Sequence, residues 1–187
     1  QFYFRIDTIM LGILASETEV GLYSVAFNLM EGTFFIPTIV MAVIFPGLSQ
    51  AKHFSAYFRK GVVLLTLTGI AGGATVFLLA DSIILWFYAP GFQNSADILE
   101  ILALAIPLVF WGYLMTQSLV ALDHNRIYLV ITATGLLLNV LLNFWLIPEY
   151  GASGAAFSTV ITEALIPLSC LPMILKYHFS QSPANVT

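Results

Sequence analysis

Charge is scarce in this sequence. Only 9% of its 187 residues are charged, whereas 59% are hydrophobic, and soluble domains carry roughly 25% charged residues. A soluble fold of this size could not cover its surface with so few charges, but a surface in contact with lipid can be apolar. The shortage of charge excludes an ordinary soluble domain and indicates an integral membrane protein.

Cysteine and histidine are also rare. Cys170 is the one cysteine, so neither an internal disulfide nor a cysteine metal cluster can form. Three scattered histidines (His53, His124 and His178) have no metal-ligand spacing. The net charge of −4 argues against nucleic acid as a partner, because nucleic-acid binding requires clustered Lys and Arg. We therefore expect no metal site, no cofactor and no nucleic-acid partner.

What is present is a series of apolar stretches separated by short polar breaks. They cover residues 1–14, 20–45, 61–80 (extending to 88), 98–122, 127–147 and 154–175. The last five reach the roughly 20 residues that a membrane-spanning helix needs, and they lack the alternation of a β-barrel. The first would rise only about 21 Å as a helix, so we interpret it as a helix cut by the start of the sequence. The expected fold class is all-α: a polytopic membrane protein, a bundle of about six transmembrane helices in a single domain over residues 1–187.

The basic residues indicate an orientation. If the spans alternate in direction, all six basic residues fall on one side, together with both ends of the chain: Arg5, Lys52, Arg59, Lys60, Arg126 and Lys176. The charged residues in the loops on the other side are all acidic. The positive-inside rule therefore predicts a multi-pass protein of the cytoplasmic membrane, surrounded by membrane lipids, with the basic loops and both ends in the cytoplasm.

Two carboxylates are expected near the middle of their spans, Glu31 in the second and Glu163 in the sixth. A carboxylate at that depth is costly and normally faces a cavity, a partner or the bundle interior. Each has two interpretations, a coupling or substrate-facing group, or a hydrogen-bonded residue inside the bundle. Asn28 lies on the same helical face as Glu31 and favours a cavity wall. Thr159 and Thr162 offer Glu163 local hydrogen bonds.

Arg5 and Asp7 form a second candidate site in the first span. Their spacing directs them to different faces of a helix, so they are not a pair with each other. Arg5 could meet an anionic headgroup in a central cavity, or it could extend to the inner interface. Both interpretations remain open.

Polar side chains one turn apart also occur in two other spans. Asn139 and Asn143 lie in the fifth span, with Thr132 and Gly135 roughly on the same side, and Gln117 follows Tyr113 in the fourth. Such stripes bind neighbouring helices or line a wet path. The expected cavity and substrate-binding residues are Arg5, Asp7, Asn28, Glu31, Gln117, Asn139 and Asn143, and the expected coupling residues are Glu31 and Glu163.

Five segments carry a resemblance to a known family. They are RIDTIMLG (5–12), EVGLYSVAFNL (19–29), FPGLSQ (45–50), YAPGFQNSADILEILAL (88–104) and LNFWLIPEYGASGAAFSTVITE (142–163). In this order and spacing they resemble the second half of polysaccharide-biosynthesis flippases. That family belongs to the multidrug/oligosaccharidyl-lipid/polysaccharide exporter superfamily.

The resemblance implies two six-helix lobes facing each other across a central cavity. This chain would be the second lobe, and the amino-terminal lobe of the same protein would be its partner. The implied activity is the flipping of lipid-linked oligosaccharide or polysaccharide precursors across the cytoplasmic membrane by alternating access. The implied substrate site contains basic residues that bind the phosphate or pyrophosphate of the lipid carrier, and Arg5 is the one candidate here.

Two other functions remain as alternatives. One is a cation-coupled multidrug exporter of the same superfamily, in which Glu31 and Glu163 would be coupling groups. The other is an intramembrane glycan-processing enzyme. The sequence lacks the HExxH, GxSxG, Walker A and GxGxxG motifs, and its loops leave no room for a soluble catalytic domain. We therefore expect a transporter and not an enzyme.

Overall fold

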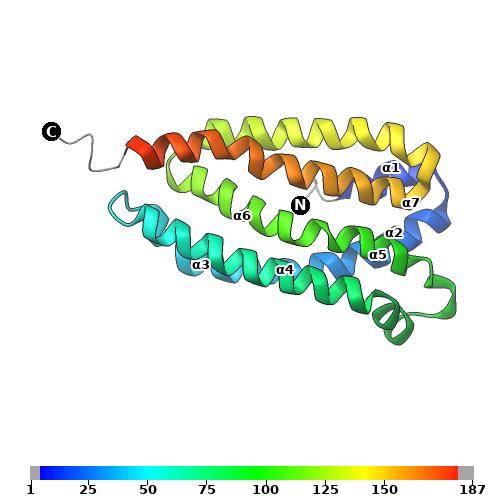
Figure 1. Ribbon diagram of the computed structural model, residues 1–187. Helices are drawn as coiled ribbons and strands as arrows, with labels where there is room; N and C mark the ends of the chain where they lie inside the picture. Colours follow the sequence, from blue (N-terminus) through cyan, green and yellow to red (C-terminus); the bar gives the residue numbers. More distant parts are fainter. Residues whose placement is uncertain (1–4, 181–187) are drawn as a thin grey trace.

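The computed structural model describes residues 5–180, with side chains described up to Tyr177. Within this part of the chain every regular element is helical, which confirms the all-α membrane bundle (Figure 1). The elements are α1 (Ile6–Leu14), α2 (Glu17–Glu31), η2 (Gly32–Phe34), α3 (Phe35–Leu48), α4 (Phe54–Phe87), η3 (Pro90–Phe92), α5 (Ser95–Ala103), α6 (Ala105–Ala121) and α7 (Asn125–Ser180). Helix α6 lies centrally, between α7 on one side and α3 and α4 on the other.

Helix α7 is a hairpin of two antiparallel halves that meet at Gly151 (Figure 1). Gly151 has φ 55° and ψ −133°, a left-handed conformation that favours glycine. The turn is tight, because a Cβ added to Gly154 would lie 2.3 Å from the carbonyl oxygen of Leu146. The second half of α7 then begins at Ala152, whose N–H donates to Glu19 Oε2 at 2.6 Å. Glu19 of α2 thus caps a helix that is distant in sequence.

Two of the helix breaks occur where a proline removes a backbone hydrogen bond. Proline cannot donate to the carbonyl four residues earlier, and its ring crowds that carbonyl. For Pro37 this carbonyl belongs to Thr33, which lies in the 3-10 turn η2 between α2 and α3. For Pro107 it belongs to Ala103, the last residue of α5, and α5 and α6 meet at 41°. By contrast, the backbone of α7 stays helical through Pro167.

The bundle packs closely where α4 crosses the α5–α6 break. A Cβ on Gly73 would lie 2.9 Å from the Ala103 carbonyl oxygen, and one on Gly69 would lie 3.0 Å from Pro107 Cα. These glycines therefore let the two backbones approach, as in other small-residue helix contacts. This packing explains why Gly69 and Gly73 lie four residues apart, on one face of the predicted span 61–80.

Much of the surface of the bundle is apolar. Three helical segments are long and apolar enough to cross a membrane, Glu17–Leu48, Phe54–Phe87 and Asn125–Tyr177, and the bent pair α5–α6 makes a fourth. In the most apolar window of Phe54–Phe87 only 17% of the residues are buried. Such an apolar surface is stable in contact with lipid and not with water, so the chain is a multi-pass membrane protein.

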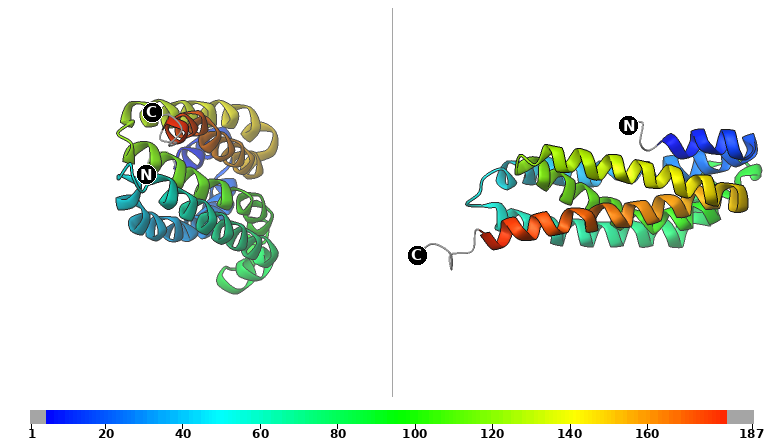
Figure 2. Two further views of the ribbon diagram at one scale, coloured as in Figure 1. Left: turned by 60° about the vertical axis from the view of Figure 1, so that its left-hand side comes forward. Right: turned by 90° about the horizontal axis from the view of Figure 1, so that it is seen from above.

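The two ends of the bundle differ in charge. The α3–α4 loop, the α6–α7 turn and the last turns of α7 lie at one end (Figures 1 and 2). These segments and the first turns of α4 contain the exposed Lys52, Arg59, Lys60, Arg126 and Lys176. Glu17, Asp97 and Glu149, all exposed, come from the turns at the opposite end. Arg5 is different, because α1 starts about midway along the bundle and not at the basic end.

Candidate functional site

The first candidate site is a buried hydrogen-bond cluster around Asp7, which is 3% exposed. Tyr23 of α2 donates to Asp7 Oδ2 at 2.8 Å, and Thr159, in the second half of α7, donates to the same oxygen at 2.9 Å. Asn143, in the first half of α7, donates through Nδ2 to Asp7 Oδ1. It also donates to Asn139 Oδ1 at 3.1 Å. One carboxylate therefore joins α1, α2 and both halves of α7.

The composition of this cluster suits the binding of a proton or a small cation. Within the described part of the chain Asp7 forms no ion pair, so its partners are uncharged hydroxyl and amide groups. The side-chain oxygen of Asn143 is buried and has no hydrogen-bond partner among the described residues. Buried carboxylates in membrane bundles are typical of proton and ion pathways. Among the described residues no group of three or more His, Cys, Asp or Glu could hold a metal ion.

The second candidate site is the pair of Arg5 and Glu31. Arg5 precedes α1 and Glu31 ends α2, and their side chains approach to 4.0 Å between Nη2 and Oε2. They are 68% and 42% exposed, respectively. Arg5 and Asp7 lie on opposite sides of α1, since one is exposed and the other is buried. Asn28, one turn before Glu31, is exposed as well.

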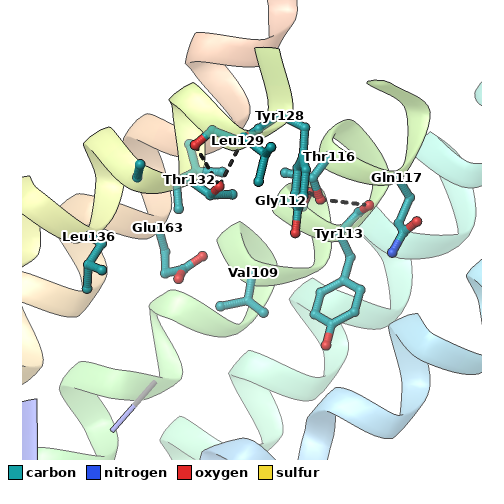
Figure 3. Close-up of a pocket in the computed structure, with 12 residues that line it drawn as sticks. Val109, Gly112, Tyr113, Thr116, Gln117, Tyr128, Leu129, Thr132, Leu136 and Glu163 are labelled. Carbon is teal, nitrogen blue, oxygen red and sulfur yellow. Dashed lines mark hydrogen bonds between the residues drawn. The ribbon is translucent and has the colours of Figure 1, made fainter. Parts of the chain in front are cut away.

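The third candidate site is a cavity of about 520 Å³ between α6 and α7. Its lining is mostly apolar and aromatic, and Glu163 contributes a buried carboxylate to it (Figure 3). Glu163 packs beside Gly112 of α6, where an added Cβ would lie 3.7 Å from Glu163 Oε2, an ordinary van der Waals contact. Tyr113 and Gln117 also line a neighbouring cavity of about 340 Å³ with Thr38 of α3.

The predicted polar residues are therefore divided among three locations. Asp7, Asn139 and Asn143 meet in the buried cluster; Arg5, Asn28 and Glu31 belong to the exposed face; Gln117 and Glu163 line the α6–α7 cavity. The stripe of the fifth span is divided too, because Thr132 lines the cavity and the two asparagines face Asp7.

The threonines near Glu163 have different partners from those expected. Thr159 donates to Asp7 and not to Glu163, and the buried hydroxyl of Thr162 has no hydrogen-bond partner in the part of the chain that the structure describes. Tyr23 was not predicted as a site residue, although it is fully buried against Asp7. Its position within EVGLYSVAFNL, a largely apolar segment, gave no sign of a polar role. Only the approach of α1 to α2 reveals it.

The fold and these sites define a membrane bundle with charged and polar groups at membrane depth, a pattern found in transporters. A family model described as MatE matches residues 1–145, and the chain belongs to this family. The family consists of membrane transporters, which confirms the predicted superfamily and the prediction that the chain is not an enzyme.

Two of the curated relatives that the chain matches are named as probable flippases. The chain is 28% identical over 171 residues to a probable flippase, AglR, of Haloferax volcanii, covering 87% of the chain and 36% of the relative. It is 25% identical over 170 residues to a probable low-salt glycan biosynthesis flippase, Agl15, of the same organism, covering 88% and 36%. A membrane protein of Methanocaldococcus jannaschii, described as uncharacterized, is 27% identical over 174 residues, covering 91% and 41%.

The chain thus spans between 36% and 41% of the length of these three relatives. No solved structure matches it significantly.

Proposed function

We propose that this chain forms one lobe of a flippase that moves lipid-linked oligosaccharide or polysaccharide precursors across the cytoplasmic membrane by alternating access. The observation that carries the proposal is the exposed pair of Arg5 and Glu31. Charged side chains at membrane depth face water or a partner and not lipid. The face with Arg5, Asn28 and Glu31 then forms the wall of a hydrophilic cavity, and a second lobe of the protein forms the opposite wall. The names of two relatives, both probable flippases, support this cargo class.

The depth of Arg5 supports a role in binding an anionic headgroup. Helix α1 starts about midway along the bundle (Figure 2), so Arg5 is separated from the basic loops at one end. A guanidinium group binds phosphate through parallel hydrogen bonds. In this proposal Arg5 binds the phosphate or pyrophosphate of the lipid carrier inside the cavity. The five other basic residues stay at the cytoplasmic end, in accord with the positive-inside rule.

The proposal is tested in cells that lack their own sugar-lipid flippase. The complete protein, which includes this chain, is expressed as wild type, as Arg5→Gln and as Arg126→Gln, and the surface glycan is measured. Arg126→Gln is the matched control, because Arg126 is exposed at the basic end. We expect the wild type and the control to restore the surface glycan. With Arg5→Gln the amount of surface glycan should be at least about tenfold lower than with the wild type. Equal restoration by all three variants at equal membrane expression would remove Arg5 from the site. No restoration by the wild type would count against the flippase itself.

The Asp7 cluster is our candidate for the coupling site. Binding or release of a proton or small cation there would alter hydrogen bonds that join α1, α2 and both halves of α7. Such a change in buried contacts can favour one of two packing arrangements. We expect Asp7→Asn, which keeps the shape of the side chain, to abolish gradient-driven transport in proteoliposomes. Unchanged dependence on proton and sodium gradients would exclude Asp7 as the coupling group.

One observation favours the second candidate, a cation-coupled multidrug exporter. The α6–α7 cavity combines the buried Glu163 with the aromatic rings of Tyr113 and Tyr128, and no Lys or Arg lines it. An acidic group with aromatic walls suits an apolar organic cation. Export of ethidium that is lost in Glu163→Gln, but kept in the exposed control Glu149→Gln, would favour this function. Absence of ethidium export by the wild type would count against it.

A further inference from the structure

The ion pair between Arg5 and Glu31 is weakly held. Arg5 Nη2 and Glu31 Oε2 are 4.0 Å apart, which is longer than a charge-assisted hydrogen bond, and both side chains are substantially exposed. Exposed ion pairs of this kind contribute little to stability. Glu31 therefore neutralises Arg5 without immobilising it.

The Glu31 side chain of this pair lies at the end of a helix, where it has space to move. Glu31 is the last residue of α2, and the 3-10 turn η2 follows directly at Gly32. The Glu31 side chain is 42% exposed, and no described residue lies within 4 Å of a Cβ added to the adjacent Gly32. The carboxylate therefore has room to move away from Arg5 without disturbing the core.

We propose that Glu31 is an internal competitor for the anion-binding group Arg5. It pairs with the guanidinium when the site is empty, and the phosphate or pyrophosphate of the cargo displaces it. This inference rests on the proposed function, because it takes the cargo to be an anionic lipid. A phosphate group forms parallel hydrogen bonds to guanidinium, which the single long contact with Glu31 does not match.

The competition affects release as well as binding. An unpaired Arg5 at membrane depth would hold a multiply charged anion strongly, and a cargo held too strongly would not leave. When Glu31 returns to Arg5 it replaces the departing phosphate, so the arginine is never left without an anion. Glu31 then lowers the affinity for phosphate and favours turnover.

The test measures binding to the purified complete protein in nanodiscs of uncharged lipid. The probe is farnesyl diphosphate, with farnesol as its uncharged counterpart and inorganic diphosphate as the free anion. The variants are Glu31→Gln, Arg5→Gln, the double variant, and Glu149→Gln as an exposed carboxylate control from the opposite end.

We expect Glu31→Gln to bind farnesyl diphosphate roughly two- to fivefold more tightly, as the loss of a weak competitor implies. Farnesol binding and the Glu149→Gln control should be unchanged. The double variant should match Arg5→Gln, since Glu31 competes only where Arg5 is present. An unchanged or weaker affinity in folded Glu31→Gln would overturn the inference, and so would the same gain without Arg5. Inorganic diphosphate should gain by a similar factor, because Glu31 competes with the phosphate group and not with the lipid chain. Wild-type binding of inorganic diphosphate as tight as that of farnesyl diphosphate would identify a general anion site and contradict the lipid cargo.

A reversed pair keeps the test informative if Glu31→Gln folds poorly. The double variant Arg5→Glu with Glu31→Arg retains one cation and one anion on the same face. We expect it to bind farnesyl diphosphate within about threefold of the wild type, whereas complete loss of binding would overturn the exchange. Because binding is measured without transport, failure of the exchange is distinguishable from failure of the flippase proposal, which the glycan assay measures.

Discussion

Asp7 and Glu163 are both buried carboxylates, yet their surroundings differ. Three donors from two other helices converge on Asp7, which is 3% exposed. Glu163 faces a cavity of about 520 Å³ with mostly apolar walls. Asp7 therefore holds helices together, whereas Glu163 presents its carboxyl group to a space that a ligand or water can enter. Depth in the membrane alone does not distinguish these two roles; the packing around each carboxyl group does.

The largest expected difference is between the losses of stability when Asp7 and Glu163 are each replaced by alanine. Asp7→Ala leaves the donors of Tyr23, Asn143 and Thr159 without their acceptor, and each unsatisfied buried group costs about 1–3 kcal/mol. We expect the free energy of unfolding, measured by SDS titration of the purified protein in mixed micelles, to fall by about 3 kcal/mol or more. Glu163→Ala should cost less than about 2 kcal/mol, because that side chain already borders a cavity. Similar losses for both variants would remove the distinction between the two sites.

A smaller effect is expected at the hairpin that holds the two halves of α7 beside Asp7. In Gly151→Ala the new Cβ would sit at positive φ and 2.5 Å from Glu19 Oε2. This combination of strain and collision should lower the free energy of unfolding by about 2 kcal/mol. Gly91→Ala is the matched control, since no atom of the described residues lies within 4 Å of a Cβ added there. Unfolding curves that coincide for the two variants would show that the hairpin tolerates a side chain.

The smallest and sharpest contrast lies between two threonines one turn apart. Thr159 donates to Asp7, but the buried hydroxyl of Thr162 has no partner within the described residues. Thr159→Val should lower the free energy of unfolding by about 1–2 kcal/mol, whereas Thr162→Val should leave it unchanged or raise it by up to about 1 kcal/mol. The same SDS titration measures both. A clear loss in Thr162→Val would indicate that this hydroxyl has a partner in the membrane, such as a water molecule in the Glu163 cavity.

The helices themselves could be predicted, because the length and apolarity of each stretch specify a membrane span. Their ends were harder to predict. The polar segment before residue 61 was expected to be a loop, but α4 begins at Phe54. The second apolar stretch, residues 20–45, was expected to end before Pro46 and Gly47, but α3 continues through both residues to Leu48. Where a helix ends near the membrane interface depends on packing, here on the contact of Phe54 with Tyr177. The polarity of the local sequence contains no information about such a contact.

The site residues could be selected from the sequence but not grouped. Polar side chains in apolar spans are conspicuous, so Asp7, Glu31, Asn143 and Glu163 were all identified. Their partners come from other helices, such as Tyr23 and Thr159 for Asp7, more than a dozen residues away in each case. Hydrophobic periodicity indicates which face of one helix is polar, but it contains no information about which neighbour that face meets.

The sequence alone determined that the chain is a membrane bundle and which end is basic, because these follow from the transfer of apolar and charged groups between water and lipid. Only the tertiary structure decided that Asp7 is enclosed by uncharged donors, that Arg5 faces Glu31 midway along the bundle, and that Glu163 borders a cavity. Hydrogen bonds and ion pairs act over a few ångströms, so they depend on how the helices cross and not on their order along the chain.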